Sequence, residues 1–159
     1  MNRLNRKGER GFSTFEVLTV VSLIGIASAM ILPNYIQMNE RSLMKQAASE
    51  LNAQINVARM NAMNLNTTVN VNMAVSSGIV VATFTNAGGG DVMEPKVMRR
   101  DITGFSGATQ VRFSSLGLRL GGGAGNQTIT LQSRNGLRHD IQITPAGRTR
   151  WCASSPCPA

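Results

Sequence analysis

The chain is poor in the residues from which catalytic and metal sites are built, with one histidine and two cysteines among its 159 residues. A zinc site normally takes four ligands, whereas His139, Cys152 and Cys157 supply three. The single histidine also lacks the partnered carboxylate pattern of a nucleophilic site. The sequence therefore predicts a protein without catalytic residues, metal ligands or a cofactor.

Phosphate-binding motifs are also missing, although the chain has 16 glycines. Neither G-x-G-x-x-G nor G-x-x-x-x-G-K-[ST] occurs. The glycine runs at 88–90 and 121–125 precede strand-like sequence rather than a helix start, which indicates loops. The length suits one domain, or a small domain with an appendage, and is too short for a multi-domain enzyme.

Acidic residues are scarce at both ends of the chain, whose net charge is +8. Residues 1–11 carry a net charge of +3, residues 102–159 hold six arginines against Asp140, and the residues between these regions are neutral overall. Two separate basic regions need two separate explanations.

From Phe12 to Leu32 the chain carries a single charged residue, Glu16. A helix of this length spans about 30 Å, which is the thickness of the hydrocarbon core of a bilayer. By the positive-inside rule the basic leader before it stays on the cytoplasmic side and the rest of the chain lies outside. The sequence predicts a membrane-spanning segment at residues 12–33.

Three interpretations of this segment differ in where the chain is cut. A secretory signal would be cleaved after Ala27-Ser28-Ala29, and a plain anchor would not be cleaved. Glu16 argues against both, because a carboxylate inside an apolar run costs up to about 3 kcal/mol. Cleavage at Gly11-Phe12 would instead create an amino group about 6 Å along the helix from Glu16, and the same amine of a neighbouring subunit could pair with the carboxylate.

The string from Arg10 to Glu16, the apolar run and Pro33 at its end resemble the class III signal of type IV pilins and pseudopilins. The resemblance implies that a membrane-embedded prepilin peptidase cuts after Gly11 and methylates Phe12. It also implies that Glu16 guides subunits into a filament and that Pro33 bends the helix. The residues after Phe12 are slightly more polar than is usual in this family.

After Pro33 the pattern becomes amphipathic and predicts a helix that continues over 34–64. Pro33 removes one backbone hydrogen bond and should bend the helix without ending it. Methionines 38, 44, 60 and 63 are interpreted as flexible core residues rather than as metal ligands. The predicted apolar face comprises Ile36, Leu43, Ala47, Leu51, Ile55, Ala58 and Ala62.

The sequence pattern of residues 65–159 predicts a β-rich head domain. Alternating or apolar runs predict strands at 67–74, 78–85, 92–99, 109–116, 127–133, 137–144 and 148–152. Turns are predicted at 104–107, 121–125, 134–136 and 145–147, and Asn135-Gly136 is a strong hairpin signal. The predicted fold class is α+β, with a long N-terminal helix laid on an antiparallel sheet, and His139 is expected in the core or at an edge of that sheet.

Arginines concentrate near the C-terminus. In an extended segment over 148–152, Arg148 and Arg150 project from one face about 6.6 Å apart, and each guanidinium can donate a planar fork to a phosphate. Arg112, Arg119, Arg134 and Arg138 are candidates to extend this surface. The charge favours a polyanion bound without base reading, but a solvated basic face, or one that meets acidic headgroups or a neighbouring subunit, explains it as well.

Trp151 and the two cysteines adjoin these arginines. The Trp151 indole could stack on a base or pack within the protein, and we favour packing. In an oxidising compartment Cys152 and Cys157 would close a small loop that stabilises the fold by about 2 kcal/mol.

The C-terminal half is similar to the head domain of the GspH/FimT family of minor pilins and pseudopilins. The similarity lies in 113–117, 129–131, 141–143 and the string Gly147-Arg148-Thr149-Arg150. In the FimT branch a Gly-Arg-x-Arg motif is associated with DNA binding in natural transformation, which implies Gly147, Arg148 and Arg150 as DNA-binding residues.

The resemblance implies a precursor with a cleaved leader at 1–11, held in the bacterial inner membrane with a periplasmic head. The subunit is then built into a pilus or pseudopilus, and the cell surface is a further location that the resemblance allows. The implied partners are prepilin peptidase, other minor pilins or pseudopilins, the inner membrane and double-stranded DNA. Two alternatives remain open: a type II secretion pseudopilin that binds sibling subunits and exported proteins, and a minor pilin that only primes assembly.

Overall fold

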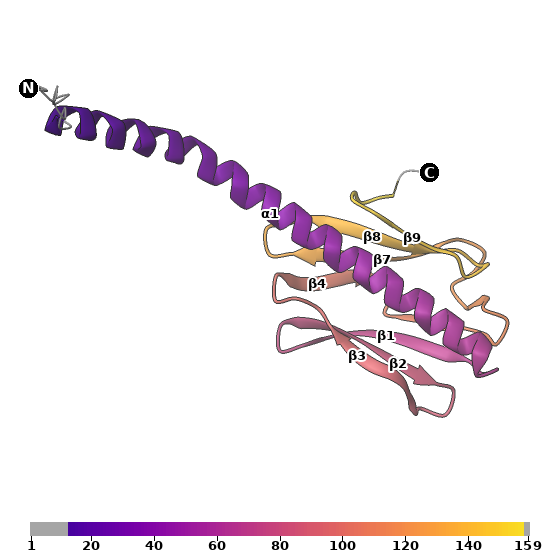
Figure 1. Ribbon diagram of the computed structural model, residues 1–159. Coiled ribbons are helices and arrows are strands. Elements are labelled where there is room, and N and C mark those ends of the chain that lie inside the picture. The colour runs from indigo at the N-terminus through magenta and orange to yellow at the C-terminus, as the bar shows by residue number, and fades with distance from the viewer. Residues whose placement is uncertain (1–12, 158–159) are drawn as a thin grey trace, which may run out of the picture. The chain divides into compact units, whose positions relative to one another are not determined.

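The computed structural model describes residues 13–157, apart from the side chains of residues 30–34. The chain consists of two compact units, one ending at Glu40 and the other running from Arg41 onward. Helix α1 (Thr14–Asn64) belongs to both units, and the nine strands found in residues 13–157 belong to the second (Figure 1). The helix ends at the residue that its amphipathic pattern predicts.

In the first unit α1 continues through Pro33, as predicted for a proline that does not end the helix. The hydroxyl groups of Thr19, Ser22 and Ser28 each donate a 2.8 Å hydrogen bond to the backbone carbonyl four residues earlier. These bonds satisfy polar groups within the helix itself, so the apolar run carries few unpaired donors.

Several residues of the predicted signal lie at or beyond the edge of the described chain. Gly11 and Phe12 lie outside the described residues, as does the side chain of Pro33. Glu16 is described and lies exposed in the first turn of α1. Within the described residues no helix is long and apolar enough to cross a membrane.

The second unit holds two antiparallel sheets rather than the single sheet that the sequence pattern suggests (Figure 1). The first has the order β3-β2-β1-β5-β6 and the second the order β4-β7-β8-β9. The strand bounds of the first sheet are β1 Val69–Ser76, β2 Ile79–Asn86, β3 Asp91–Val97, β5 Gln110–Phe113 and β6 Arg119–Leu120. Those of the second are β4 Ile102–Gly107, β7 Gln127–Ser133, β8 Arg138–Ile143 and β9 Thr149–Cys152.

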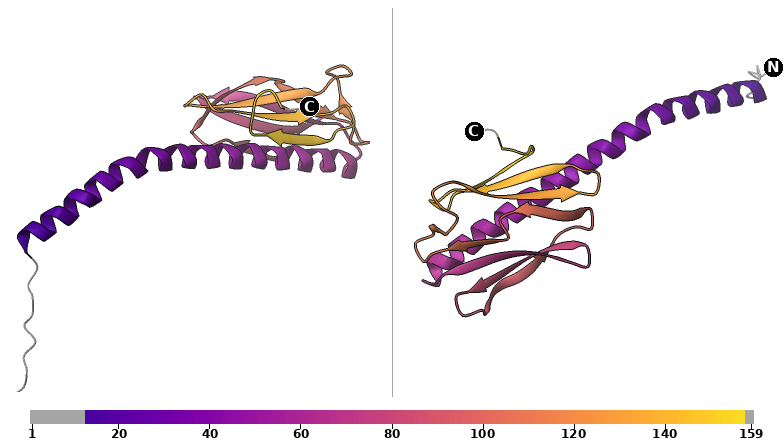
Figure 2. Two further views of the ribbon diagram at one scale, coloured as in Figure 1. Left: turned by 90° about the horizontal axis from the view of Figure 1, so that it is seen from above. Right: turned by 180° about the vertical axis from the view of Figure 1, so that it is seen from behind.

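The part of α1 after Glu40 packs along one face of these sheets (Figure 2). The buried face of the helix presents Leu51 and Ile55 together with four alanines, which let the helix approach the strands closely. The strands contribute alternate residues to the same core, among them Val69 and Val71 of β1, Phe84 of β2, Ile129 and Leu131 of β7, and Ile141 and Ile143 of β8. This core fixes which side of each strand faces away from the helix.

Two expectations about the core are wrong. Of the four helix methionines, Met44 is buried, whereas Met38, Met60 and Met63 are 74%, 55% and 40% exposed. Ile36 is also exposed, at 56%. Met60 and Met63 lie in turns where Ala58 and Ala62 are buried, so the sheets cover these turns but not the side of the helix that carries the two methionines. An apolar side chain does not by itself indicate which side of a helix is covered.

The predicted turn at 104–107 is also wrong, because these residues form most of β4, which pairs with β7. Glycine here permits a strand that bends and approaches its neighbour closely. The register shifts between Ile102 and Gly104, and Gly107 has a φ of +92°. A Cβ on Gly107 would lie 2.2 Å from the carbonyl oxygen of Thr128. Glycine residues in a sequence can therefore mark a bulge within a strand as well as a loop.

Candidate nucleic-acid interface

A tight turn between β8 and β9 presents the arginine pair. The Gly147 amide donates to the carbonyl of Thr144 at 2.9 Å, and the Thr144 amide donates to the carbonyl of Arg148 at the same distance. The Thr144 side chain adds a bond from the Arg148 amide to its hydroxyl oxygen at 3.1 Å. Pro145 presets the turn, and Gly147 takes the left-handed conformation that closes it, with a φ of +75°.

Gly147 allows a close contact between two loops as well as the left-handed backbone conformation of the turn. A Cβ at this position would lie 2.0 Å from the carbonyl oxygen of Gly117, in the loop between β5 and β6. The Arg119 amide of that region donates to the carbonyl of Pro145 at 3.1 Å. The glycine of the Gly-Arg-x-Arg string therefore lets the turn lie against a second loop, which is a structural role.

Arg148 and Arg150 are both exposed, while Thr149 and Trp151 between and after them are half-buried. This is the alternation that an extended segment predicts, although β9 itself begins at Thr149. Arg150 lies opposite Gln142 of β8, and its Nε and Nη2 donate to Gln142 Oε1 at 3.1 and 2.9 Å. β9 is the edge strand of its sheet, so the pair projects at the rim of the head.

The other predicted members of the site are spread along β8. Arg138 is exposed at the start of β8, on the same outer face as Gln142, and lies about 13 Å from Gln142 along the strand. Arg134 is exposed in the preceding turn, farther still from β9. The structure thus brings Gly147, Arg148 and Arg150 together and leaves Arg134 and Arg138 at the opposite end of the strand.

Arg112 and Arg119, the two remaining arginines of the C-terminal region, differ in their exposure to solvent. Arg112 is exposed on β5, in the other sheet. Arg119 is only 6% exposed, so its assignment to the basic surface is wrong. Its guanidinium donates to the carbonyls of Gly121, Gly123 and Gly125 at 2.7, 2.9 and 2.6 Å, and so holds the glycine loop after β6 in place. A formal charge in the sequence does not reveal that a guanidinium is already occupied.

The acidic residue of the C-terminal region, Asp140, is buried. Asp140 is the sole acidic residue among 102–159, and it is 2% exposed. It lies on the outer face of β8, where the Thr130 hydroxyl donates to its Oδ1 at 2.7 Å and Cys152 is its cross-strand neighbour. Cys152 and Cys157 form a disulfide, and Cys157 Sγ lies 4.0 Å from the Asp140 carbonyl oxygen. Among residues 102–157 the exposed side-chain charge is therefore positive.

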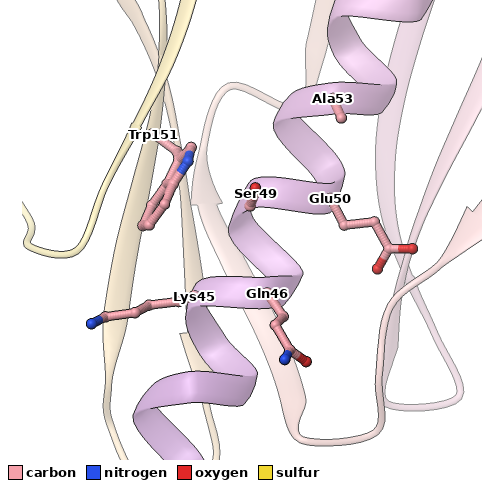
Figure 3. A pocket seen from close by; sticks show the side chains of 6 residues that line it. All are labelled: Lys45, Gln46, Ser49, Glu50, Ala53 and Trp151. Atoms are coloured by element: carbon pink, nitrogen blue, oxygen red, sulfur yellow. The ribbon is translucent and has the colours of Figure 1, made fainter.

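Trp151 packs within the protein, as predicted from the sequence. Its ring stacks on that of His139, with centroids 6.1 Å apart and planes 8° from parallel. Trp151 also lines an open groove of about 540 Å³, together with Lys45, Gln46, Ser49, Glu50 and Ala53 of α1 (Figure 3). By the alternation of a strand, the indole lies on the face of the sheet opposite to Arg150.

His139 belongs to this packing. It is 4% exposed, and its Nδ1 has no hydrogen-bond partner within the described chain. Burial lowers the pKa of His139 below its usual 6.5, the charge of Lys45 lowers it further, and Asp140 partly offsets both effects. The ring is therefore a neutral core residue near pH 7, as its place on the apolar side of the strand predicts.

The fold defines a class, because a long N-terminal helix packed on antiparallel sheets is the architecture of pilin-like proteins. The chain is similar to the type IV minor pilin FimU of Pseudomonas aeruginosa, at 20% identity over 76% of this chain and 96% of that one, with a TM-score of 0.57. It is also similar to EpsH, the minor pseudopilin of the Type 2 Secretion System of Vibrio cholerae, at 16% identity over 69% and 95%, with a TM-score of 0.52.

Residues 47–147 match the family described as type II transport protein GspH. The match covers more than half of the chain, which therefore belongs to the GspH family of minor pilins and pseudopilins. No curated protein sequence matches the chain significantly.

Membership of this family makes the protein a structural, non-enzymatic subunit of a type IV pilus or a type II secretion system. Family membership implies other pilins or pseudopilins as partners, and it suggests a location in the membrane or in a pilus-like filament. The family match ends at Gly147, so it includes neither Arg148 and Arg150 nor the disulfide. Any function of the arginine pair must be argued from its own geometry.

Proposed function

We propose that this protein is a minor pilin that captures extracellular double-stranded DNA through Arg148 and Arg150 during natural transformation. The observation that carries the proposal is the placement of two exposed arginines, two residues apart, at the free edge of a sheet. The single acid of the region, Asp140, is buried beneath the same surface. Among residues 102–157 a phosphate backbone would thus meet two exposed guanidinium groups and no exposed side-chain carboxylate.

The arrangement suits contact with phosphates rather than recognition of sequence. These arginines lie on a turn and a four-residue edge strand, and not on a helix that could enter a groove and read bases. Arg138 and Arg134 extend the basic surface along β8 and would meet a duplex only if it followed that strand. Binding should therefore be independent of sequence and weaken as salt rises.

DNA binding can be tested on residues 34–159, which include every buried core residue of the head and lack the basic leader. In 0.1 M salt each lost phosphate contact should reduce the affinity about 8-fold, so R148A/R150A should bind a duplex about 60-fold more weakly than the wild type. The variant R41A/R99A removes the same charge from two exposed positions outside the site. Equal binding by R148A/R150A and R41A/R99A would refute the assignment.

Assembly of the subunit is the second part of the proposal. Prepilin peptidase removes residues 1–11 after Gly11, Phe12 becomes the methylated N-terminus, and residues 12–33 enter the inner membrane while 34–64 and the head at 65–159 lie in the periplasm. In the filament, Glu16 pairs with the Phe12 amine of a neighbouring subunit, because a carboxylate in apolar surroundings requires a compensating charge. Pro33 bends the helix where it passes from the membrane segment to the periplasmic segment.

The processing step has a direct test. Mass spectrometry of the mature protein should give a chain that begins at Phe12. A chain that begins at Met30 would instead mean that Ala27-Ser28-Ala29 is a signal-peptidase site, and would overturn this part of the proposal.

A second function, as a pseudopilin of type II secretion, is favoured by the description of the matching family and by the likeness to EpsH. In that case the head would bind sibling subunits and exported proteins rather than DNA. Absence of duplex binding by the wild-type head, together with incorporation into a filament that depends on Glu16, would favour this function.

A further inference from the structure

One side chain of α1 reaches the turn that carries the arginine pair. Arg59 is half-buried, and its Nε donates to the carbonyl of Gly117 at 2.8 Å. Its Nη2 donates to the carbonyl of Ala146 at 3.4 Å. One guanidinium thus joins two separate loops, the loop between β5 and β6 and the turn between β8 and β9. The first bond is short and the second is long, so Gly117 is the principal anchor.

Both loops have a glycine where the guanidinium lies. A Cβ on Gly117 would lie 3.1 Å from Arg59 Nε and 2.7 Å from Met63 Sδ, and a Cβ on Gly147 would lie 3.0 Å from the same Nε. Both glycines have a positive φ, +72° and +75°. The space that Arg59 fills is therefore created by two residues without side chains, which sequence spacing alone does not reveal.

The loop between β5 and β6 is held by hydrogen bonds of its own. The Ser114 amide donates to the Leu118 carbonyl at 2.8 Å, and the Gly117 amide donates to the Ser114 carbonyl at 2.8 Å. The Ser114 hydroxyl oxygen accepts further bonds from the amides of Leu116 and Leu118 at 3.3 and 3.2 Å. Arg59 therefore connects the turn at 144–148 to a loop whose own backbone groups are paired.

We infer that Arg59 is a positioning residue for DNA binding, which acts through the turn at 144–148 and not by contact with DNA. It holds the Ala146 carbonyl next to Gly147, and so fixes the backbone from which Arg148 projects. A guanidinium on a fixed backbone loses less conformational freedom when it binds a phosphate than one on a mobile turn. This inference rests on the proposed DNA-binding function and adds a residue about 90 positions away from the motif.

The test compares two arginines of α1 in the full chain, purified in a non-ionic detergent and titrated with a 30-base-pair duplex. R59A and R41A each remove one positive charge from the helix, but Arg41 is exposed, and no bond that ties it to the turn is found in the described chain. R59A should weaken binding about 3-fold to 10-fold more than R41A does. R59K keeps the charge but not the planar fork, and should fall between R59A and the wild type.

A double-mutant cycle separates positioning from direct contact. If Arg59 acts through Arg148, adding R59A to R148A should cost no further affinity. An undiminished R59A loss in the R148A background would mean that Arg59 touches DNA itself, and would overturn the inference. Equal binding by R59A and R41A would overturn it too, while leaving the proposed function intact if R148A binds weakly. A wild-type protein that does not bind the duplex would overturn the proposed function and this inference together.

Hydrogen exchange provides a readout that does not depend on DNA. R59A should raise the exchange rate of the Gly147 and Arg148 amides at least about 10-fold, because opening of the turn becomes easier. The Gly136 amide donates to the Ser133 carbonyl at 3.1 Å in the turn at the other end of β8, and its rate should not change. Unchanged exchange at Gly147 in a folded R59A protein would refute the positioning role.

Discussion

The Gly147 position allows the packing of the arginine turn to be tested against a matched control. Gly147 and Gly136 both close turns next to β8, and their φ angles are +75° and +79°. A Cβ at Gly136 would meet no atom within 4 Å, whereas a Cβ at Gly147 would lie 2.0 Å from the Gly117 carbonyl oxygen. Alanine at the two positions therefore carries the same backbone penalty but differs in steric overlap.

The expected free energies of unfolding follow from this difference. Alanine in the left-handed region costs about 1–2 kcal/mol, which is the whole effect expected for G136A. G147A must also displace one loop from the other, and overpacking of this kind adds about 1–3 kcal/mol. With a urea m-value of about 2 kcal/mol/M, an extra 2 kcal/mol lowers the unfolding midpoint of G147A by about 1 M relative to G136A.

Urea unfolding of residues 34–159, followed by circular dichroism, measures both variants under the same conditions. The same midpoint for G147A and G136A would mean that the two loops do not pack as closely as Gly117 and Gly147 require. That result would also remove the structural basis for the role of Arg59.

Three further predictions concern other parts of the chain. The pKa of His139 is lower in the folded protein than in the unfolded chain, so the stability of the folded protein should fall as the pH drops below about 6.5. The urea midpoint of H139Q should therefore decrease less between pH 7.5 and 5.5 than that of the wild type. The C152S/C157S variant should lose about 2 kcal/mol of stability, since the loop it opens is short, and a reductant should lower the midpoint of the wild type but not of the variant. E16A should be absent from sheared filaments that still contain the charge-matched control E94A, and normal incorporation of E16A would contradict the assembly proposal.

The sequence predicts the parts of the fold that depend on local periodicity. The amphipathic pattern locates the end of α1 at Asn64 and most of its buried face, because a helix repeats every 3.6 residues whatever lies against it. The alternation of Val69, Val71 and Met73 likewise identifies the inner face of β1. Alternation around Arg148 and Arg150 predicts their exposure in the same way.

The errors come from contacts between residues that are far apart in the chain. Gly104 and Gly107 have the composition of a turn, and only the pairing with β7 makes them part of a strand. Arg119 counts as a surface charge until its three carbonyl partners are known. No local signal connects Arg59 to Gly117 and Ala146, because these contacts join residues that are far apart in the chain.

The dependence of duplex binding on salt tests the central claim most directly, because its slope counts phosphate contacts. For residues 34–159, a plot of the logarithm of the binding constant against the logarithm of salt concentration should be less steep by about 1.8 in R148A/R150A than in the wild type. The charge-matched R41A/R99A variant should keep the wild-type slope. A slope that is the same in all three proteins would contradict the assignment of DNA binding to Arg148 and Arg150.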